Sequence, residues 1–248
     1  HSFDDMTNVS KETRQMLEDN FVINYIQVDT IQRSNDGTIK NAVRLHDGLI
    51  VESVLIPTKT RTTACVSSQV GCSLDCKFCA TKITSPEGLG MSPKRITVST
   101  SGVPKMIKKM ADDDVKFNLA VSLHSAIDEV RTSIMPFNET FPLEDLREAL
   151  EYWYAKTERK ISYEYVVWKG INDSQKDIDA FVAFCKYVPC KVNIIEYNPI
   201  DDGEFQQASN QALENYINAL EKNRIVVNVR RSRGKDIDAA CGQLANKS

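Results

Sequence analysis

The first part of the chain alternates short β-rich runs with tight-turn sequences. A helical pattern over residues 10–19 begins at Ser10, a residue type that favours the N-terminal cap of a helix. Three runs of strand-forming residues follow: Val22–Arg33, Thr38–Leu45 and Leu49–Leu55. Both connectors between these runs contain Asp-Gly, which is favoured in tight hairpins. The pattern predicts a small antiparallel β extension over residues 1–62.

From residue 63 onward, short apolar strands alternate with amphipathic helices. The predicted strands are Ala64–Ser68, Arg95–Thr100, Phe117–Leu123, Ile161–Val167, Val192–Tyr197 and Ile225–Val229. The predicted helices are Pro104–Met110, Asp128–Ile134, one that begins at Pro142, Ser174–Tyr187, Ser209–Glu221 and Asp236–Leu244. This alternation predicts an α/β domain over residues 63–248, in which crossover helices join the strands of a parallel sheet.

Polar residues lie at the ends of three of the predicted strands. They are Ser99 with Ser101, Ser122 with His124, and Glu196 with Asn198. Barrels of parallel strands carry their chemistry at the carboxyl ends of the strands. Serine, histidine and asparagine also form turns where no site exists, so each of these residues has a purely structural interpretation. Three such strand ends in one sheet are stronger evidence for a site than any one of them.

One connection is too short for this fold. Only fifteen residues separate Cys79 from Arg95, and they include Pro86, Gly88 and Pro93. A parallel crossover needs about a dozen residues, usually a helix, before the next strand begins. Either a helix and a strand are missing from this chain, or the sequence joins two ends across a stretch that it does not include.

Composition narrows the class of protein. The 248 residues carry a net charge of -3, so there is no overall basic signature of nucleic-acid binding. No apolar run reaches the length needed to cross a membrane, and no secretory signal is visible. The seven cysteines are an odd number and do not suggest a secreted disulfide scaffold. These features predict a cytoplasmic monomer without membrane association.

Three closely spaced cysteines predict a metal cluster. Cys72, Cys76 and Cys79 follow the spacing C-x3-C-x2-C, with Phe78 before the last cysteine. Three thiolates can ligate a four-iron cluster and leave one iron open to a small molecule. Structural zinc is the alternative, but it needs four closed ligands, and no second cysteine or histidine pair is present. The spacing is similar to the signature of the radical S-adenosylmethionine (SAM) superfamily.

The resemblance extends over nearly the whole chain. The motifs that carry it are Cys65–Gly71, Ser99–Gly102, Ser122–His124, Glu196–Pro199 and Asp238–Leu244. Together with the cysteine triplet they resemble the RlmN/Cfr family of radical SAM RNA methyltransferases. This resemblance implies a partial (β/α)6 radical-SAM barrel with the small β extension at its N-terminal end. The tail Arg233–Asp238 resembles the RlmN branch, which methylates adenine C2, more than the Cfr branch, which methylates C8.

The resemblance implies a radical methyl transfer to adenine C2 of 23S rRNA and tRNA. A [4Fe-4S] cluster on Cys72, Cys76 and Cys79 and two SAM molecules per turnover are implied with it. Cys241 is implied as the methyl carrier, and Cys65 as the residue that releases the product by forming a disulfide with Cys241. That disulfide requires reduction between turnovers, and the cluster requires a cellular reductant such as flavodoxin.

Further residues are implied more weakly. Glu52 lies thirteen residues before Cys65 and matches the proposed proton acceptor of the family. Cys65 is an alternative acceptor, and Glu52 has the alternative interpretation of an exposed strand residue. The residues that match SAM-binding positions of the family are Ser99, Ser122, Leu123, His124 and Asn198. Cys185 and Cys190 are interpreted as small buried hydrophobic residues.

Two features depart from the family. Its Gly-Glu-Pro motif, which holds the amino group of SAM, is absent, and its expected place is the short stretch after Cys79. A chain that truly lacks this motif is expected to bind SAM poorly. The N-terminal accessory domain that helps to grip RNA is also mostly missing, so residues 1–62 are interpreted as its remnant. RNA contact is expected instead from local basic patches, above all the one at Arg230, Arg231, Arg233 and Lys235.

Three other functions remain open from the sequence. The first is C8 methylation of adenine. The second is a radical SAM reaction on another substrate, against which the presence of both Cys65 and Cys241 argues. The third is a non-catalytic RNA-binding protein that contains a metal, which would bind metal without cleaving SAM.

Overall fold

The computed structural model describes residues 2–66, 92–198 and 205–239, which form two compact units. The first unit comprises residues 2–66 together with 233–239, so the end of the described chain returns to its beginning. The second unit comprises residues 92–198 and 205–232. The sequence-based division placed a boundary at residue 62, whereas residues 63–66 and Arg233–Ala239 group here with the N-terminal sheet.

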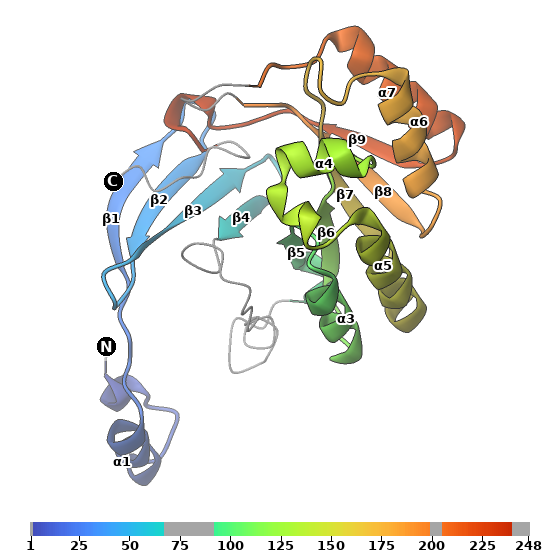
Figure 1. Cartoon of the computed structure of the whole chain (residues 1–248). Helices are drawn as coiled ribbons and strands as arrows, with labels where there is room; N and C mark the ends of the chain where they lie inside the picture. Colours follow the sequence, from blue (N-terminus) through green and yellow to red (C-terminus); the bar gives the residue numbers. More distant parts are fainter. Residues whose placement is uncertain (1, 67–91, 199–204, 240–248) are drawn as a thin grey trace. The chain divides into compact units, whose positions relative to one another are not determined.

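The first unit is a four-stranded antiparallel sheet with one helix before it (Figure 1). A 3-10 turn, Phe3–Asp5, precedes helix α1 (Lys11–Asn20), and the hydroxyl of Ser10 caps this helix by accepting the N–H of Thr13 at 3.2 Å. The strands are β1 (Gln27–Arg33), β2 (Ile39–Arg44), β3 (Ile50–Pro57) and β4 (Thr62–Val66). They pair in sequence order.

The two Asp-Gly connectors form tight hairpins, as predicted. Gly37 and Gly48 both have φ +85°, a conformation that glycine adopts without the strain a side chain would add. The carboxylates of Asp36 and Asp47 accept the N–H groups of Thr38 and Leu49, two residues further on, which closes each turn. Turn chemistry alone was enough to predict these hairpins.

The prediction for Ala64–Ser68 was wrong in its partner. We predicted this run as a strand of the parallel domain, but Thr62–Val66 pairs antiparallel with β3, and Cys65 lies opposite Val54. A turn at Thr58–Arg61 causes this pairing. The N–H and hydroxyl of Thr58 both donate to the carbonyl of Arg61, which returns the chain alongside β3.

The second unit is a five-stranded parallel sheet with helical crossovers, as predicted. Its strands are β5 (Thr97–Thr100), β6 (Asn118–Ser122), β7 (Ile161–Val166), β8 (Cys190–Ile195) and β9 (Val226–Arg230), in that spatial order. Its helices are α3 (Pro104–Asp112), α4 (Asp128–Ile134), α5 (Leu143–Thr157), α6 (Gln175–Phe184) and α7 (Asn210–Lys222). Two 3-10 turns, Pro93–Arg95 and Pro136–Glu139, complete it.

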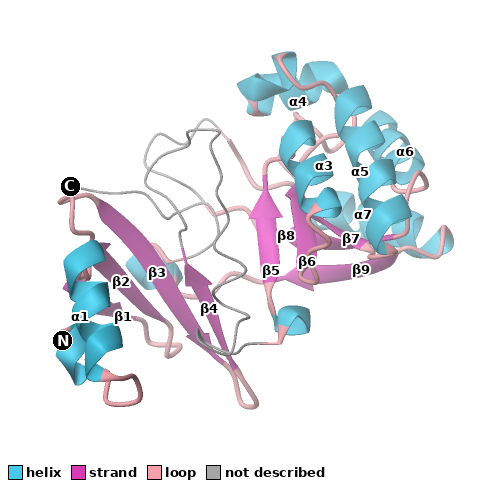
Figure 2. Ribbon diagram, turned by 90° about the horizontal axis from the view of Figure 1, so that it is seen from below, coloured by secondary structure: helices cyan, strands magenta, loops and turns pink. Residues whose placement is uncertain are grey.

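The helices cover one face of this sheet (Figures 1 and 2). Alternate strand residues such as Leu119, Tyr163 and Ile194 point into that apolar layer and are at most 1% exposed. The helices contribute the apolar faces expected from their sequence pattern, including Trp153 of α5 and Tyr216 of α7, both fully buried. Cys185 is buried in this core and Cys190 packs against it, as predicted.

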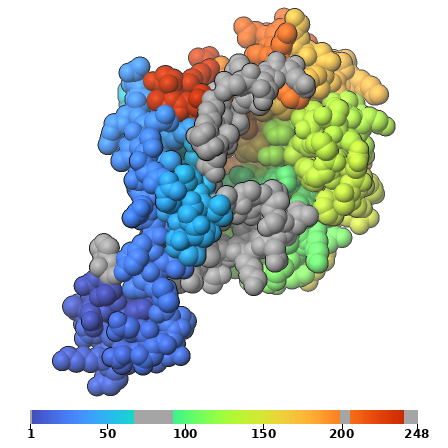
Figure 3. Space-filling view, turned by 60° about the vertical axis from the view of Figure 1, so that its left-hand side comes forward, coloured from blue at the N-terminus to red at the C-terminus, as the bar shows by residue number. Residues whose placement is uncertain are grey.

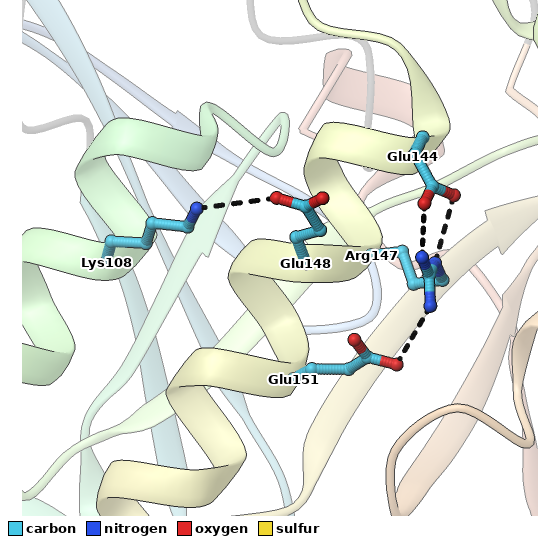
Figure 4. A network of polar contacts seen from close by, with 5 residues as sticks. All are labelled: Lys108, Glu144, Arg147, Glu148 and Glu151. Atoms are coloured by element: carbon cyan, nitrogen blue, oxygen red, sulfur yellow. Dashed lines mark hydrogen bonds and ion pairs between the residues drawn. The ribbon is translucent and has the colours of Figure 1, made fainter.

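Exposed ion pairs lie on the surfaces of α3 and α5 (Figure 4). Lys108 lies 3.8 Å from Glu148, and Arg147 pairs with Glu144 one turn before it and with Glu151 one turn after it. Such surface pairs contribute at most about 1 kcal/mol each. Lys109 likewise pairs with Asp113 at 3.4 Å, so the lysines of α3 lie on a surface whose charge is balanced.

The predicted helix at Asp236–Leu244 is wrong over the residues that the structure describes. Lys235–Ile237 form a single 3-10 turn, and Asp238 then takes φ +49°, which ends it. Hydrogen bonds with side chains of the first sheet replace helical hydrogen bonds in this segment. Residues 240–244 lie outside the described residues.

Candidate active site

Four of the predicted functional residues lie outside the described residues: Cys72, Cys76, Cys79 and Cys241. Within the part that the structure describes, no group of three or more His, Cys, Asp or Glu side chains could hold a metal ion. No described helix is long and apolar enough to cross a membrane. The donors predicted for the cluster are cysteine thiolates, which are the usual protein ligands of iron–sulfur clusters, and three of them leave one iron of a four-iron cluster open.

A row of polar side chains crosses the second sheet on the face opposite its helices. The register pairs Ser122 with Glu164, Glu164 with Asn193, and Asn193 with Asn228. Paired residues share a face of the sheet, so the four side chains are neighbours. The amide of Asn193 donates to Oε1 of Glu164 at 2.7 Å, and the amide of Asn228 donates to Oδ1 of Asn193 at 3.3 Å.

Glu164 carries a buried oxygen that needs a donor. Its side chain is 9% exposed, and Oε2 accepts no hydrogen bond from the described residues. Nη1 of Arg230 lies 3.5 Å from this oxygen and balances its charge. A buried carboxylate oxygen normally has a hydrogen-bond partner, so this face of the sheet fits a polar ligand with hydroxyl or amino donors. SAM is such a ligand.

Sequence reasoning missed Glu164 and Asn193. A signal was present, because Ile161–Val166 places polar residues at Ser162 and Glu164 within a strand predicted to lie in a parallel sheet. Strands of a parallel sheet are usually apolar on both faces. A charged residue at such a position therefore indicates a face that meets a ligand.

The SAM-binding positions implied by the resemblance lie at or just beyond the carboxyl ends of β5, β6 and β8, of which β5 and β6 are adjacent in the sheet. Ser99 is exposed near the end of β5, where it pairs with Ala120. Ser122 ends β6 and is half-buried. Asn198 follows β8 and is buried, and its amide donates to the carbonyl of Glu196 at 3.2 Å. The structure thus brings Ser99 and Ser122 to one face of one sheet.

His124 is held in a fixed orientation. It has φ +58°, and its Nδ1 accepts the N–H of Val166 at 3.2 Å, while Asn172 donates to its carbonyl at 2.6 Å. Burial first, and then the nearby charge of Arg131, lowers the pKa of His124 to about 4. The ring is therefore neutral at physiological pH, and with Nδ1 accepting a hydrogen bond, Nε2 carries the proton as a donor.

Leu123 contributes its backbone rather than its side chain. The side chain is fully buried in the apolar core, on the helix side of the sheet. Its carbonyl accepts a hydrogen bond from Nε of Arg131 at 3.1 Å. The match of Leu123 to a SAM-binding position is therefore compatible only with a contact through its main chain.

Arg131 joins the ends of β5 and β6, and sequence reasoning missed it. The fully buried guanidinium donates to the carbonyl of Ser101 at 2.8 Å, to that of Leu123, and to Oδ1 of Asn138 at 2.5 Å. Burial lowers the pKa of Arg131 to about 10, an effect that Asp128 opposes. A single arginine in a short amphipathic helix gives no signal in the sequence that it is buried.

In the first unit, Glu52 and Cys65 lie on the same face of the sheet. Lys40 pairs with Val54 and Val54 pairs with Cys65, so these three residues form one row across β2, β3 and β4. Glu52 precedes Val54 by two residues and points to the same side. The alternative that Glu52 is an exposed strand residue is wrong: it is 9% exposed, and its carboxylate pairs with Nζ of Lys40 at 3.0 Å.

Cys65 is exposed at the surface of β4. Partial burial of the sulfur raises the pKa of the Cys65 thiol above its ordinary value. Attack on another sulfur requires the thiolate, so the raised pKa makes Cys65 a slow nucleophile until a base or a positive charge comes close.

Comparison with known proteins gives a consistent picture. No family model matches the chain. Proteins named "Probable dual-specificity RNA methyltransferase RlmN" from Flavobacterium johnsoniae and Christiangramia forsetii are each 65% identical to it; both alignments cover 100% of this chain, with 87% and 86% of the relatives. One from Cytophaga hutchinsonii is 45% identical, over 99% of this chain and 83% of the relative. The crystal structure of a radical SAM methyltransferase from Sphaerobacter thermophilus superposes with a TM-score of 0.85 at 30% identity, over 98% of this chain and 88% of that one.

The alignments are longer than the chain. The alignment with the Flavobacterium johnsoniae relative extends over 303 residues and includes all 248 residues of this chain. About 55 positions of the relative inside the alignment therefore have no counterpart here. That number of positions is more than one strand and one crossover helix need, and the short connection after Cys79 predicts that such a piece is missing.

Proposed function

Because the chain belongs to the RlmN family of dual-specificity RNA methyltransferases, we propose that it methylates C2 of adenine in 23S rRNA and tRNA. The chain is a radical SAM RNA methyltransferase by this membership and by its structural likeness to a radical SAM methyltransferase. The observation that carries the proposal is similarity over the full chain that includes the Cys72, Cys76 and Cys79 triplet. Cys65 and Cys241 add the two thiols that the C2 reaction needs.

The family uses SAM and an iron–sulfur cluster, and the residues present fit both. Cys72, Cys76 and Cys79 would hold a [4Fe-4S] cluster. The row of Ser122, Glu164 and Asn193 offers hydrogen-bond acceptors to SAM, and Oε2 of Glu164 accepts no hydrogen bond from the described residues. When bound, the reduced cluster supplies the electron that cleaves SAM to a carbon radical, and it can take back the electron released later. Two SAM molecules are consumed per turnover, one as methyl donor and one as radical source.

The two thiols divide the reaction between them. C2 of adenine is electron-poor and does not attack a methyl sulfonium, so the methyl group is first stored on the sulfur of Cys241. Once the carbon radical derived from the second SAM has taken one hydrogen atom from that methyl group, the resulting methylene radical would form a carbon–carbon bond to C2. The adduct would then lose one electron to the oxidised cluster, and Glu52 would accept the C2 proton. The thiolate of Cys65 next attacks the sulfur of Cys241. A sulfur–sulfur bond forms, the sulfur–carbon bond breaks, and protonation of the released carbon completes the methyl group.

Partners follow from this chemistry. The disulfide between Cys65 and Cys241 needs a thiol reductant, and the cluster needs a one-electron donor of the flavodoxin type. RNA phosphates would bind at Arg231 and its neighbours on the path to Cys241. We propose that the protein acts as a monomer in the cytoplasm.

The deciding experiment measures the product directly. The protein is reconstituted anaerobically with iron and sulfide, then incubated with methyl-labelled SAM, a reductant and 23S rRNA fragments or tRNA. Nucleosides are analysed by mass spectrometry, with Cys241→Ala as the matched control. Labelled 2-methyladenosine that disappears in Cys241→Ala supports the proposal, whereas 8-methyladenosine would reassign the chain to the C8 reaction.

A second arm tests the missing segment. A chain in which the residues that only the Flavobacterium johnsoniae relative has are inserted where the alignment leaves them without a counterpart is assayed beside the parent. If only the restored chain forms 5′-deoxyadenosine, the parent lacks its full SAM site. If neither forms 5′-deoxyadenosine, the proposal is wrong. If both form it without methylated adenine, the radical SAM chemistry stands and the RNA substrate is wrong.

A further inference from the structure

The turn that follows β6 is held in a backbone conformation that few residues adopt. His124, at this turn, has φ +58°, in the left-handed region that is unfavourable for a residue with a side chain. The helix that follows, α4, lies on the outside of the second unit, in yellow-green in Figure 3, and Arg131 is the one residue of this fully described helix that is buried. Apolar packing of α4 therefore contributes little to the turn, and polar contacts offset its strain.

Asn172 supplies such a contact from the β7 side. Its side chain is fully buried in the bend between β7 and α6, and Nδ2 donates to the carbonyl oxygens of His124 at 2.6 Å and of Val166 at 2.9 Å. Its Oδ1 accepts the N–H of Trp168 at 2.7 Å. Two carbonyls on one side and an N–H on the other determine which end of the amide is the donor. A single side chain thus ties the turn after β6 to the end of β7.

The backbone of Asn172 is itself anchored in the core. The hydroxyl of Tyr216, a fully buried residue of α7, donates to the carbonyl oxygen of Asn172 at 2.6 Å. The hydroxyl of Tyr165, from β7, lies 3.3 Å from that of Tyr216. Because both ends of the side chain are bonded and the backbone is anchored, Asn172 presents its amide to His124 in one orientation.

The imidazole ring of His124 is bonded to the same end of β7. Its Nδ1 accepts the N–H of Val166 at 3.2 Å, while the carbonyl oxygen of Val166 accepts the amide of Asn172. The carbonyl and the ring of His124 therefore both depend on this strand end, the first through Asn172 and the second directly. If the amide is removed, the carbonyls of His124 and Val166 lose this donor, and the left-handed backbone loses a contact that offsets its strain.

We propose that Asn172 is a positioning residue for SAM, because its amide holds His124, and with it the turn Ser122–His124, in the conformation that binds the ligand. The proposal deepens the function proposed above and rests on SAM binding at this turn. Ser122 ends β6 directly before His124 and shares the open face of the sheet with Glu164. Leu123 can reach a ligand only through its main chain, so its contribution depends on the backbone conformation of the turn.

The first measurement needs neither SAM nor RNA. The chain has three histidines, so nitrogen NMR of the imidazole rings gives few signals, and the signal of His124 is the one absent from His124→Gln. In the parent, burial and the nearby charge of Arg131 hold the pKa of His124 at about 4. Asn172→Ala is expected to release the ring, so the pKa of His124 should rise toward its ordinary value of 6.5. The control Ser174→Ala removes the N-terminal cap of α6 two residues further on and should leave this pKa at its parental value.

The second measurement is the affinity for SAM, determined by anaerobic equilibrium dialysis on the protein reconstituted with its cluster. Asn172→Ala should weaken SAM binding about tenfold, which corresponds to a released turn that spends about a tenth of the time in the binding conformation. Ser174→Ala should keep the parental affinity. A merely structural role of Asn172 would lower the stability of the second unit without changing either the pKa of His124 or the SAM affinity of the folded protein.

Two further variants keep the outcome decisive. Asn172→Leu replaces Asn172→Ala if the alanine variant does not fold, since leucine fills a similar volume with no donor and no charge. Tyr216→Phe removes only the hydroxyl that anchors Asn172, and it should move the pKa and the affinity in the same direction. An unchanged pKa of His124 in the folded variants would overturn the proposal, and so would a released ring with parental SAM affinity. A released ring in a chain whose parent binds no SAM would support the hold on His124 and refute the proposed function instead.

Discussion

Replacing Arg131 by methionine tests whether one buried cation holds the strand ends of the second unit together. Arg131→Met keeps a long unbranched side chain but removes every donor. The carbonyls of Ser101 and Leu123 and the amide oxygen of Asn138 then lose a charged partner. Hydrogen bonds to charged groups contribute about 1.5–3 kcal/mol each, and an orphaned buried acceptor costs about 1–3 kcal/mol.

The opposing effect is relief from burying the guanidinium. The desolvation cost of a buried ion is several kcal/mol. The lowered pKa of Arg131 reflects this cost, because burial disfavours the charged form of the guanidinium. The loss of three hydrogen bonds outweighs the relief of one desolvation cost. Arg131→Met should therefore lower the free energy of unfolding by about 3 kcal/mol. That loss is a large fraction of the 5–15 kcal/mol of a typical domain.

Urea unfolding followed by tryptophan fluorescence measures this loss in the right unit. The chain has two tryptophans, Trp153 and Trp168, and both lie in the second unit. The matched control is Arg147→Met, which removes the exposed pairs with Glu144 and Glu151 in Figure 4 and should cost less than about 1 kcal/mol. If Arg131→Met and Arg147→Met unfold at the same urea concentration, the reasoning about buried carbonyl satisfaction is refuted.

Three further predictions follow from the same structure. The pKa of His124 is about 4 in the folded state and 6.5 in the unfolded state. The free energy of unfolding should therefore be at its full value above pH 6.5 and fall by about 3 kcal/mol as the pH drops to 4. In urea titrations at several pH values, His124→Gln should flatten this dependence. Gly234→Ala should increase tryptic cleavage at Arg233 and Lys235 severalfold, because the added carbon meets Thr38 and Ala239. The control Gly48→Ala also has a positive φ, +85°, but has nothing within 4 Å of the added carbon, and should not increase cleavage. Equal cleavage in both variants would contradict the close fit at Gly234. Glu164→Leu should weaken SAM binding in equilibrium dialysis at least tenfold, about 1.4 kcal/mol, whereas the control Glu151→Leu should leave it unchanged. Unchanged binding in Glu164→Leu would exclude the polar row around Glu164 from the SAM site.

Local sequence was sufficient for most elements of the fold. Ser10 caps its helix, the Asp-Gly turns close the hairpins, and the alternation of strands and helices gives the parallel sheet, because each depends on residues within a few positions of one another. The pairing of β4 with β3 depends instead on a turn at Thr58–Arg61 that contains no glycine, so its sequence gives a weaker signal.

The contacts that build the candidate site were mostly beyond sequence reasoning. The resemblance predicted Glu52 and Cys65, and the structure places both on one sheet face, although their catalytic roles stay predictions. Lys40, Arg131 and Glu164 were not predicted. Their roles arise from partners on other strands or at the far end of the chain, and a side chain's hydrogen-bond partner at that distance leaves no periodic trace in the sequence. The helix predicted from Asp236 was wrong for the same reason, since Lys40 and the hairpin capture its backbone.

The return of Arg233–Ala239 to the first sheet sets an order of events during synthesis. The hydrogen bonds between Ser34–Lys40 and Gly234–Asp238 join residues 198 to 202 positions apart, whereas each parallel strand of the second unit pairs with its neighbour in the chain. On the ribosome, the second unit can therefore form while the hairpin emitted first still awaits its final partner. The first sheet gains this partner only when Arg233–Ala239 emerge, so a nascent protein truncated before Arg233 would carry a folded second unit and a first sheet that lacks this segment.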